Sequence, residues 1–169
     1  MFRKLLRPWS QKLLNSIPSQ CAICKSWPAS GMVCEPCVTR FAQPVRRCSG
    51  CALILKDAIP SSIKRCGACI VNPPPVDECL SAVSYSFPWN DCIASYKFGN
   101  YPAWANALAL LMESSPNIEP AIDKADVLLP IPLSTARMQH RGYEEAVELC
   151  MSLNRAKTAA HQWVRVKDT

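Results

Sequence analysis

Eight cysteines stand in four Cys-x-x-Cys pairs between residues 21 and 69. A two-residue gap lets both thiolates of a pair reach one tetrahedral metal ion, and two such pairs complete the four-sulfur site of structural zinc. We therefore predict two zinc ions, each held by four thiolates. The predicted ligands are Cys21, Cys24, Cys34, Cys37, Cys48, Cys51, Cys66 and Cys69.

The pairs can combine in sequence or interleave. The loops between successive pairs hold 9, 10 and 14 residues. Joining the first pair to the second, and the third to the fourth, closes the shorter loops and costs less chain entropy. We therefore prefer two ribbons in tandem, with crossed pairing as the alternative.

Two other uses of the cysteines are less favoured. The first twenty residues interrupt every apolar run with charged or amide side chains, so no secretory signal is predicted and a cytoplasmic location is expected. Thiols stay reduced in that compartment, which favours metal over disulfides. An iron–sulfur cluster also takes four thiolates, but the evenly paired spacing suits zinc better. Isolated Cys79, Cys92 and Cys150 are expected to be buried free thiols.

Charge divides the chain into a basic and an acidic part. Residues 1–70 contain eleven Lys/Arg and two acids, a formal +9, whereas residues 71–169 contain eight Lys/Arg and eleven acids, a formal −3. Eight bound thiolates and two zinc ions would lower the first value to about +5, which is still basic. Cations interleaved with the cysteines could neutralise phosphates of single-stranded DNA or another nucleic acid. These predicted nucleic-acid contacts are Arg40, Arg46, Arg47, Lys56, Lys64 and Arg65.

Residues 1–20 form a basic amphipathic segment by pattern. Packing on the zinc module is the preferred interpretation, and a membrane-surface helix or a nucleic-acid arm are the alternatives. No stretch of 18 apolar residues occurs, so no transmembrane segment is predicted.

The rest of the chain predicts an α/β fold. A double zinc ribbon over residues 21–70 is followed by a proline-rich linker, 71–78, and a second domain, 79–169. Apolar periodicity in that domain predicts a buried strand followed by a loop and a helix, which is half of a parallel α/β unit. The expected elements are strand 79–87, helices 89–98 and 102–113, strand 126–132, loop 133–142 and helix 143–154.

The order of motifs resembles the ComF family of competence proteins, including its GntX-like members. The resemblance rests on the paired cysteines, Pro73-Pro74-Pro75, Tyr85-Ser-Phe-Pro-Trp89, Pro130-Ile-Pro-Leu133 with Arg137, and Arg141-Gly-Tyr143. It implies a zinc module joined to a type I phosphoribosyltransferase-like domain. It also implies a link to DNA uptake during natural transformation, with competence proteins as partners.

The resemblance further implies a pyrophosphate-side loop and, after Cys150, a second phosphate site. The resemblance assigns six residues to the pyrophosphate-side loop: Leu133, Ser134, Thr135, Arg137, Arg141 and Gly142. The second should be an acidic pair followed by a Thr/Gly-rich turn, and this sequence lacks it. Glu144 and Glu145 also replace the family's Asn and Gln. They are interpreted as ordinary acids of the first helical turn, which the helix dipole favours.

The chain therefore resembles a C-terminally truncated member, and no catalytic residue is predicted. Magnesium with phosphoribosyl pyrophosphate would bind only if another chain completed the site.

Four functions remain open at this point. The preferred one is a ComF-like zinc protein of DNA uptake whose transferase-like domain is not competent by itself. The alternatives are a stand-alone nucleic-acid-binding zinc ribbon, a transferase completed by a partner chain, and a degenerate fragment without function.

Overall fold

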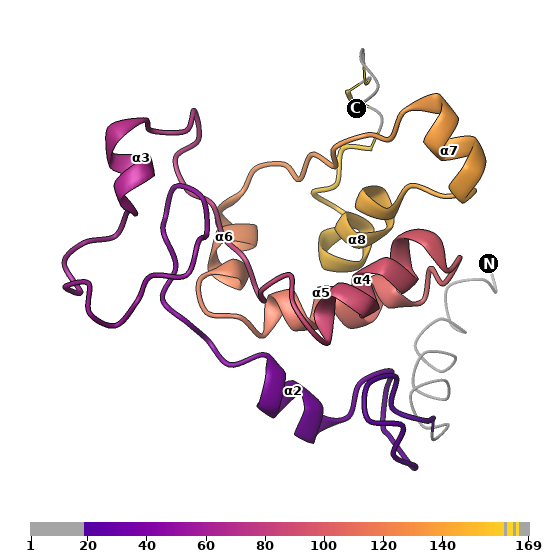
Figure 1. Ribbon diagram of the computed structural model, residues 1–169. Coiled ribbons are helices and arrows are strands. Elements are labelled where there is room, and N and C mark those ends of the chain that lie inside the picture. The colour runs from indigo at the N-terminus through magenta and orange to yellow at the C-terminus, as the bar shows by residue number, and fades with distance from the viewer. Residues whose placement is uncertain (1–18, 161, 164, 166–169) are drawn as a thin grey trace.

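The computed structural model describes residues 19–160, 162, 163 and 165, so nearly all of the predicted amphipathic segment lies outside the described residues. Seven named helices follow one another through the described part (Figure 1). They are α2 (Glu35–Phe41), α3 (Gly67–Val71), α4 (Trp89–Phe98), α5 (Trp104–Glu113), α6 (Ile118–Lys124), α7 (Thr135–Arg141) and α8 (Glu145–Asn154).

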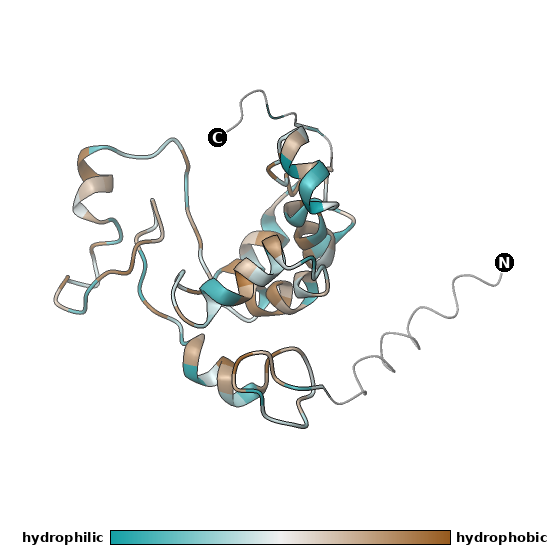
Figure 2. Cartoon of the chain, turned by 45° about the vertical axis from the view of Figure 1, so that its right-hand side comes forward, coloured by the Kyte–Doolittle hydropathy of each residue, from teal (hydrophilic) through white to brown (hydrophobic). Residues whose placement is uncertain are grey.

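The largest core lies where α4, α5 and α8 pack together (Figure 1). Apolar residues three and four positions apart place one face of each helix inward, and the packed helices in Figure 2 carry both brown and teal residues. Each large side chain removed from water there stabilises the fold by about 1.5–3 kcal/mol. The buried members are Trp89, Cys92, Tyr96, Trp104, Ala105, Leu108 and Leu111, with Leu149 of α8 packed against them.

Three predicted helices are confirmed within a few residues. The patterns over 89–98, 102–113 and 143–154 correspond to α4, α5 and α8. Helix α5 begins at Trp104, after the predicted start at residue 102, because a turn precedes it. In this turn the Tyr101 and Pro102 carbonyls accept from the amides of Trp104 and Ala105.

The strand predicted over 79–87 is wrong, because this segment is irregular, with bends and no strand pairing. Its serines hydrogen-bond locally: the Ser81 hydroxyl donates to the Val83 carbonyl at 2.8 Å, and the Ser86 amide donates to the Ser84 carbonyl at 2.8 Å. Such local bonds compete with pairing to another strand.

The loop predicted over 133–142 is also wrong, because most of it is helix α7. The Ser134 hydroxyl caps the helix by accepting from the Arg137 amide at 3.4 Å, and Gly142 ends it in the left-handed conformation with φ 75°. Both are standard helix-boundary signals that the polarity of the segment obscured.

The strand predicted over 126–132 is reduced to one bridge. Leu128 pairs in parallel with Thr158, through a 2.8 Å bond from the Leu128 amide to the Lys157 carbonyl and a 3.0 Å bond from the Ala159 amide to the Leu128 carbonyl. The other two bridges among the described residues are antiparallel, Ser19 with Ala29 and Arg47 with Ile54. The described residues thus form a helical fold, and the expected parallel α/β unit is not shown.

Candidate metal centres

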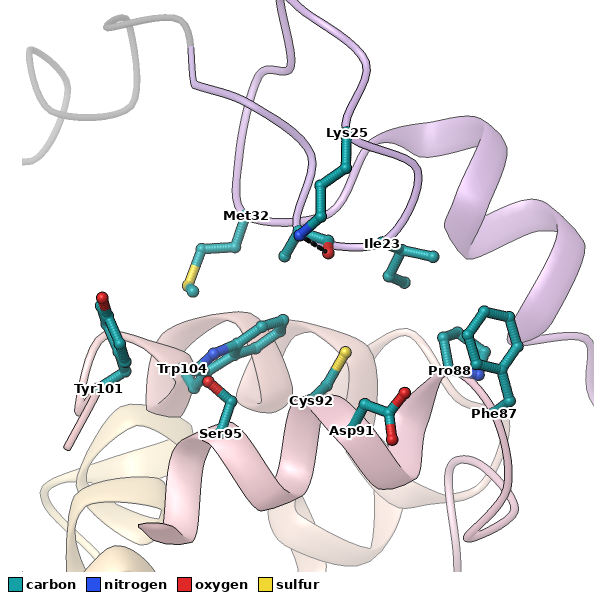
Figure 3. Close-up of a pocket in the computed structure, with 11 residues that line it drawn as sticks. Ile23, Lys25, Met32, Phe87, Pro88, Asp91, Cys92, Ser95, Tyr101 and Trp104 are labelled. Carbon is teal, nitrogen blue, oxygen red and sulfur yellow. Dashed lines mark hydrogen bonds between the residues drawn. The ribbon is translucent and has the colours of Figure 1, made fainter. Parts of the chain in front are cut away.

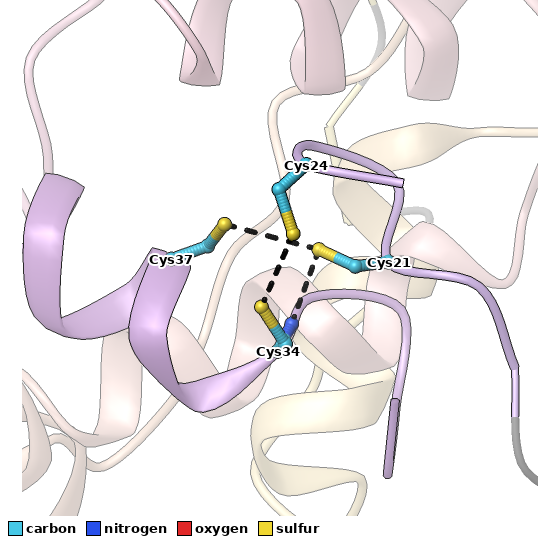
Figure 4. A group of neighbouring side chains, drawn as sticks. All are labelled: Cys21, Cys24, Cys34 and Cys37. Carbon is cyan, nitrogen blue, oxygen red and sulfur yellow. Dashed lines mark hydrogen bonds between the residues drawn. The ribbon is translucent and has the colours of Figure 1, made fainter. Parts of the chain in front are cut away.

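The first cysteine cluster brings Cys21, Cys24, Cys34 and Cys37 around one point (Figure 4). All four sulfur atoms lie within 4.8 Å of one another. The Cys21–Cys37 and Cys24–Cys34 sulfur separations are 3.9 and 3.6 Å. A tetrahedral zinc ion with bonds of about 2.3 Å requires sulfur separations of about 3.8 Å. The four thiols therefore have the spacing of a zinc site.

The second cluster, Cys48, Cys51, Cys66 and Cys69, has the same closeness, with 3.8 Å between the Cys51 and Cys66 sulfurs. Both clusters unite neighbouring pairs of the sequence, so the preference for sequential pairing is confirmed. Two four-cysteine sites suited to zinc thus lie in tandem.

The two clusters share one backbone plan. In each, the residue after the first pair has a positive φ, 61° at Lys25 and 58° at Ala52. Its amide donates back to the first cysteine's carbonyl, at 2.9 Å from Lys25 to Cys21 and 2.7 Å from Ala52 to Cys48. This tight turn directs both sulfurs of the pair to the same side.

The second pair of each cluster begins a short helix. Cys34 is the N-cap of α2, and Cys66 is the N-cap of α3. Each cap donates its amide to the first sulfur of its cluster: Cys34 to Cys21 at 3.4 Å, and Cys66 to Cys48 at 3.2 Å. Amide donors stabilise thiolate over thiol, which prepares these sulfurs to bind a cation.

The thiols differ in how readily they ionise. Hydrogen bonds from the Ser26 side chain and backbone lower the pKa of Cys24 to about 6, and the Cys66 amide is the main cause that lowers the pKa of Cys48 to about 6. Burial raises the pKa of Cys37 to about 12, and the hydrogen bond with Cys51 is the first cause that raises the pKa of Cys69 to about 12. Crowded thiolates repel one another, so a dication is needed to ionise a whole cluster.

The first cluster also contacts the helical core. The Trp89 indole nitrogen donates to the Phe41 carbonyl at 2.8 Å, joining α4 to the end of α2. A cavity of about 570 Å³ lies between this part of the chain and the helices, and in it Ile23, Lys25 and Met32 face Cys92 and Trp104 (Figure 3). The segment around the first cluster therefore forms a surface against which α4 and α5 pack.

The predicted nucleic-acid contacts separate into two groups. The Arg46 guanidinium donates to three loop carbonyls, those of Ile59, Pro60 and Ile63. The Arg47 guanidinium donates to the Ala52 carbonyl and the Ser84 hydroxyl. Both arginines therefore hold loops together. Arg40, Lys56 and Lys64 are exposed and Arg65 is half-buried.

The predicted pyrophosphate-side residues lie in and next to α7. Ser134 is buried as its cap, whereas Thr135 and Arg137 are exposed. Arg141 forms an ion pair with Glu145, and its guanidinium lies 4.9 Å from the centre of the Phe98 ring. Glu144 accepts from the Leu133 amide at 3.1 Å. The two acids therefore hold this segment in place in addition to beginning α8.

Sequence reasoning missed the contacts that link α4 to α8. The Tyr96 hydroxyl donates to the Glu145 carbonyl at 2.7 Å, and the Tyr143 hydroxyl donates to the Tyr96 carbonyl. Burial raises the pKa of both phenols, so they remain donors. The helical spacing of Tyr96 indicated burial, but its partner was 49 residues away in sequence.

The three isolated cysteines lie outside both clusters. Cys92 is buried, and Cys79 and Cys150 are partly buried. Burial raises the pKa of Cys92 and Cys150, which keeps them as thiols. The prediction of buried free thiols is thus confirmed for Cys92, whereas Cys79 and Cys150 are free thiols that are only partly buried.

None of the described helices is long and apolar enough to cross a membrane.

Comparison with known proteins finds relatives linked by name to DNA. The chain is 27% identical over 143 residues to "DNA utilization protein YhgH" of Salmonella typhimurium, covering 82% of this chain and 61% of the relative. It is also 27% identical over 145 residues to the protein of that name in Escherichia coli K12, covering 83% and 62%. This chain thus spans about three-fifths of these relatives' length. No protein-family model and no solved structure matches it.

Proposed function

We propose that this chain is a zinc-stabilised DNA-binding protein that takes part in the uptake or use of DNA. One observation supports this above all: the similarity to DNA utilization proteins extends over 82–83% of a chain that contains two complete four-cysteine clusters. In this proposal, cations around the clusters form the surface that contacts DNA, and DNA is the class of partner that the relatives' name suggests. Membership of the ComF family is part of the same proposal and rests on the ordered motifs.

In this proposal, zinc has a structural role. Both sites are closed by four protein ligands, so neither keeps an open position for substrate. Without metal, residues 21–70 could hardly fold, because only Ala29 and Leu55 join the cysteines as buried apolar residues there. DNA would contact exposed cations around the second cluster, Lys56 and Lys64 first.

A second candidate is a protein whose DNA contacts lie entirely in the zinc module. The observation that favours it is the division of charge, +9 in residues 1–70 against −3 in residues 71–169. Both candidates predict salt-dependent binding, since both release counterions from phosphates. They differ in whether the helical part contributes affinity.

The test is fluorescence anisotropy of the full-length, zinc-loaded chain with labelled single-stranded and double-stranded oligonucleotides of about 20 residues. We expect binding that weakens steeply with salt and is lost on chelation. Lys56→Gln and Lys64→Gln together should weaken binding severalfold and lower the salt slope by about 1.4 for a single strand. The matched control is Lys124→Gln, an exposed lysine of α6. Absence of DNA binding by the zinc-loaded chain would contradict the proposal.

A further inference from the structure

A cavity of about 500 Å³ lies away from both cysteine clusters, where α7 meets the end of α4. Three segments line it: the turn at Tyr85, the end of α4 at Lys97 and Phe98, and α7. The α7 residues are Ala136, Arg137, His140 and Arg141. Its volume is within the range that small ligands occupy.

Exposed aromatic rings are its first feature. Tyr85 is 73% exposed and Phe98 is 68% exposed, whereas Tyr96, on the same helix as Phe98, is buried. The Arg141 guanidinium already lies 4.9 Å from the Phe98 ring centre. Ring faces and guanidinium planes are the surfaces on which nucleobases stack.

Its charge is the second feature. Lys97, Arg137, His140 and Arg141 line the cavity, and none of the described residues that line it is acidic. Glu145 does not line the cavity, and it pairs with Arg141. The basic side chains of the lining come from two different helices, α4 and α7, so one anionic group in the cavity would meet cations of both helices.

We propose that this cavity binds one nucleotide unit. The base would stack on Tyr85 and on the Arg141–Phe98 pair, and the phosphate would lie among Lys97, Arg137 and His140. A free nucleotide and a nucleotide of single-stranded DNA share this chemistry, whereas a duplex hides the faces of its bases. The single-strand source rests on the proposed function, that the chain binds DNA, and it would give the helical part a role in affinity.

The test compares two exposed tyrosines in the full-length chain. Tyr85→Ala should weaken binding of labelled oligo(dT) by about 5- to 100-fold, the range expected for one lost base stack, whereas Tyr85→Trp should preserve it. Tyr101→Ala is the matched control, because Tyr101 is 60% exposed and lines a different cavity, the one that Ile23, Lys25 and Met32 also line. It should change affinity less than twofold.

A second comparison tests the phosphate contact. Lys97→Gln should lower the slope of log affinity against log salt by about 0.7, while Lys124→Gln, on α6, should leave the slope unchanged. Thermal unfolding of each variant confirms that it is folded. Because Tyr85 and Lys97 are both exposed, neither change should shift the unfolding midpoint appreciably.

Competition with thymidine monophosphate separates the two sources. Displacement of oligo(dT) only by millimolar nucleotide supports a strand site, and displacement at micromolar concentrations supports a free-nucleotide site. If the wild-type chain binds no DNA, the proposed function fails but the cavity is still tested by direct titration with the nucleotide. Binding of that nucleotide that Tyr85→Ala abolishes supports the inference. Equal behaviour of Tyr85→Ala and Tyr101→Ala in both assays, or no nucleotide binding at all, overturns it.

Discussion

The backbone amide of Cys66 donates a hydrogen bond to the Cys48 sulfur at 3.2 Å, linking residues 18 positions apart. The bond joins the start of α3 to the tight turn at the first cysteine pair of the second cluster. Cys34 and Cys21 have the same relationship in the first cluster, at 3.4 Å. Each site thus combines one tight turn with one helix start.

Replacing Cys48 with serine should remove one zinc ion and leave the other. Cys48 is fully buried, and its sulfur accepts from the amides of both Gly50 and Cys66. A hydroxyl does not supply the soft, ionised ligand that zinc prefers there. Metal analysis should find about one zinc ion per chain instead of two. Cys79→Ser, outside both clusters, should keep two; equal zinc content in the two variants would contradict this assignment.

Zinc affinity should fall as the pH falls. The pKa of Cys37 and of Cys69 is raised to about 12, so without zinc each cluster holds at least one proton at neutral pH that binding must expel. Proton release of one per site makes the apparent affinity fall at least about tenfold for each pH unit. Below pH 6 the slope should steepen, because Cys24 and Cys48, with pKa values of about 6, then also protonate.

This dependence is measurable by competition with a chromophoric chelator whose own protonation is corrected, between pH 8 and pH 5. An affinity independent of pH over that range would show that the thiols are not the ligands.

Trp89→Phe should destabilise the chain by about 1–3 kcal/mol. The change removes the indole donor and leaves the Phe41 carbonyl without it, at a position where Trp89 is only 3% exposed. Denaturant unfolding followed by far-ultraviolet circular dichroism measures the loss. The control is Trp163→Phe, whose side chain is exposed and which should alter stability by less than about 0.5 kcal/mol.

Glu145→Ala should cost about 3 kcal/mol of stability, because it leaves the Arg141 charge buried without its partner. Their side chains are only 7% and 11% exposed. Replacing both, Glu145→Leu with Arg141→Met, should recover much of the loss, since a buried pair is often exchangeable for apolar side chains. Glu148→Ala, at an exposed position of the same helix, should have little effect. A double variant as unstable as Glu145→Ala would contradict this interpretation of the pair.

The two four-cysteine clusters were predictable from the sequence because their geometry is local. Each cluster closes through short loops, and Cys-x-x-Cys spacing alone nearly fixes the direction of two sulfurs. Helices α4, α5 and α8 were predictable for a similar reason, since their apolar spacing is internal to each segment.

The errors lie where structure depends on distant partners. A strand is stable only beside another strand, and the pattern at residues 79–87 contains no information on whether one is present. Leu128 pairs with Thr158 in a single parallel bridge, and no longer strand forms there. The fixed positions of Arg46 and Arg47 were equally unpredictable, because their acceptors are loop carbonyls defined by the folded module.

The first measurement to make is the zinc content and thermal unfolding of the purified full-length chain, with and without a strong chelator. We expect about two zinc ions per chain and a cooperative transition that chelation abolishes, with Trp89 and Trp104 fluorescence shifting to the red as the first cluster separates from the helices. A chain that holds no zinc, or one whose cooperative unfolding is unchanged by removing zinc, would contradict this expectation.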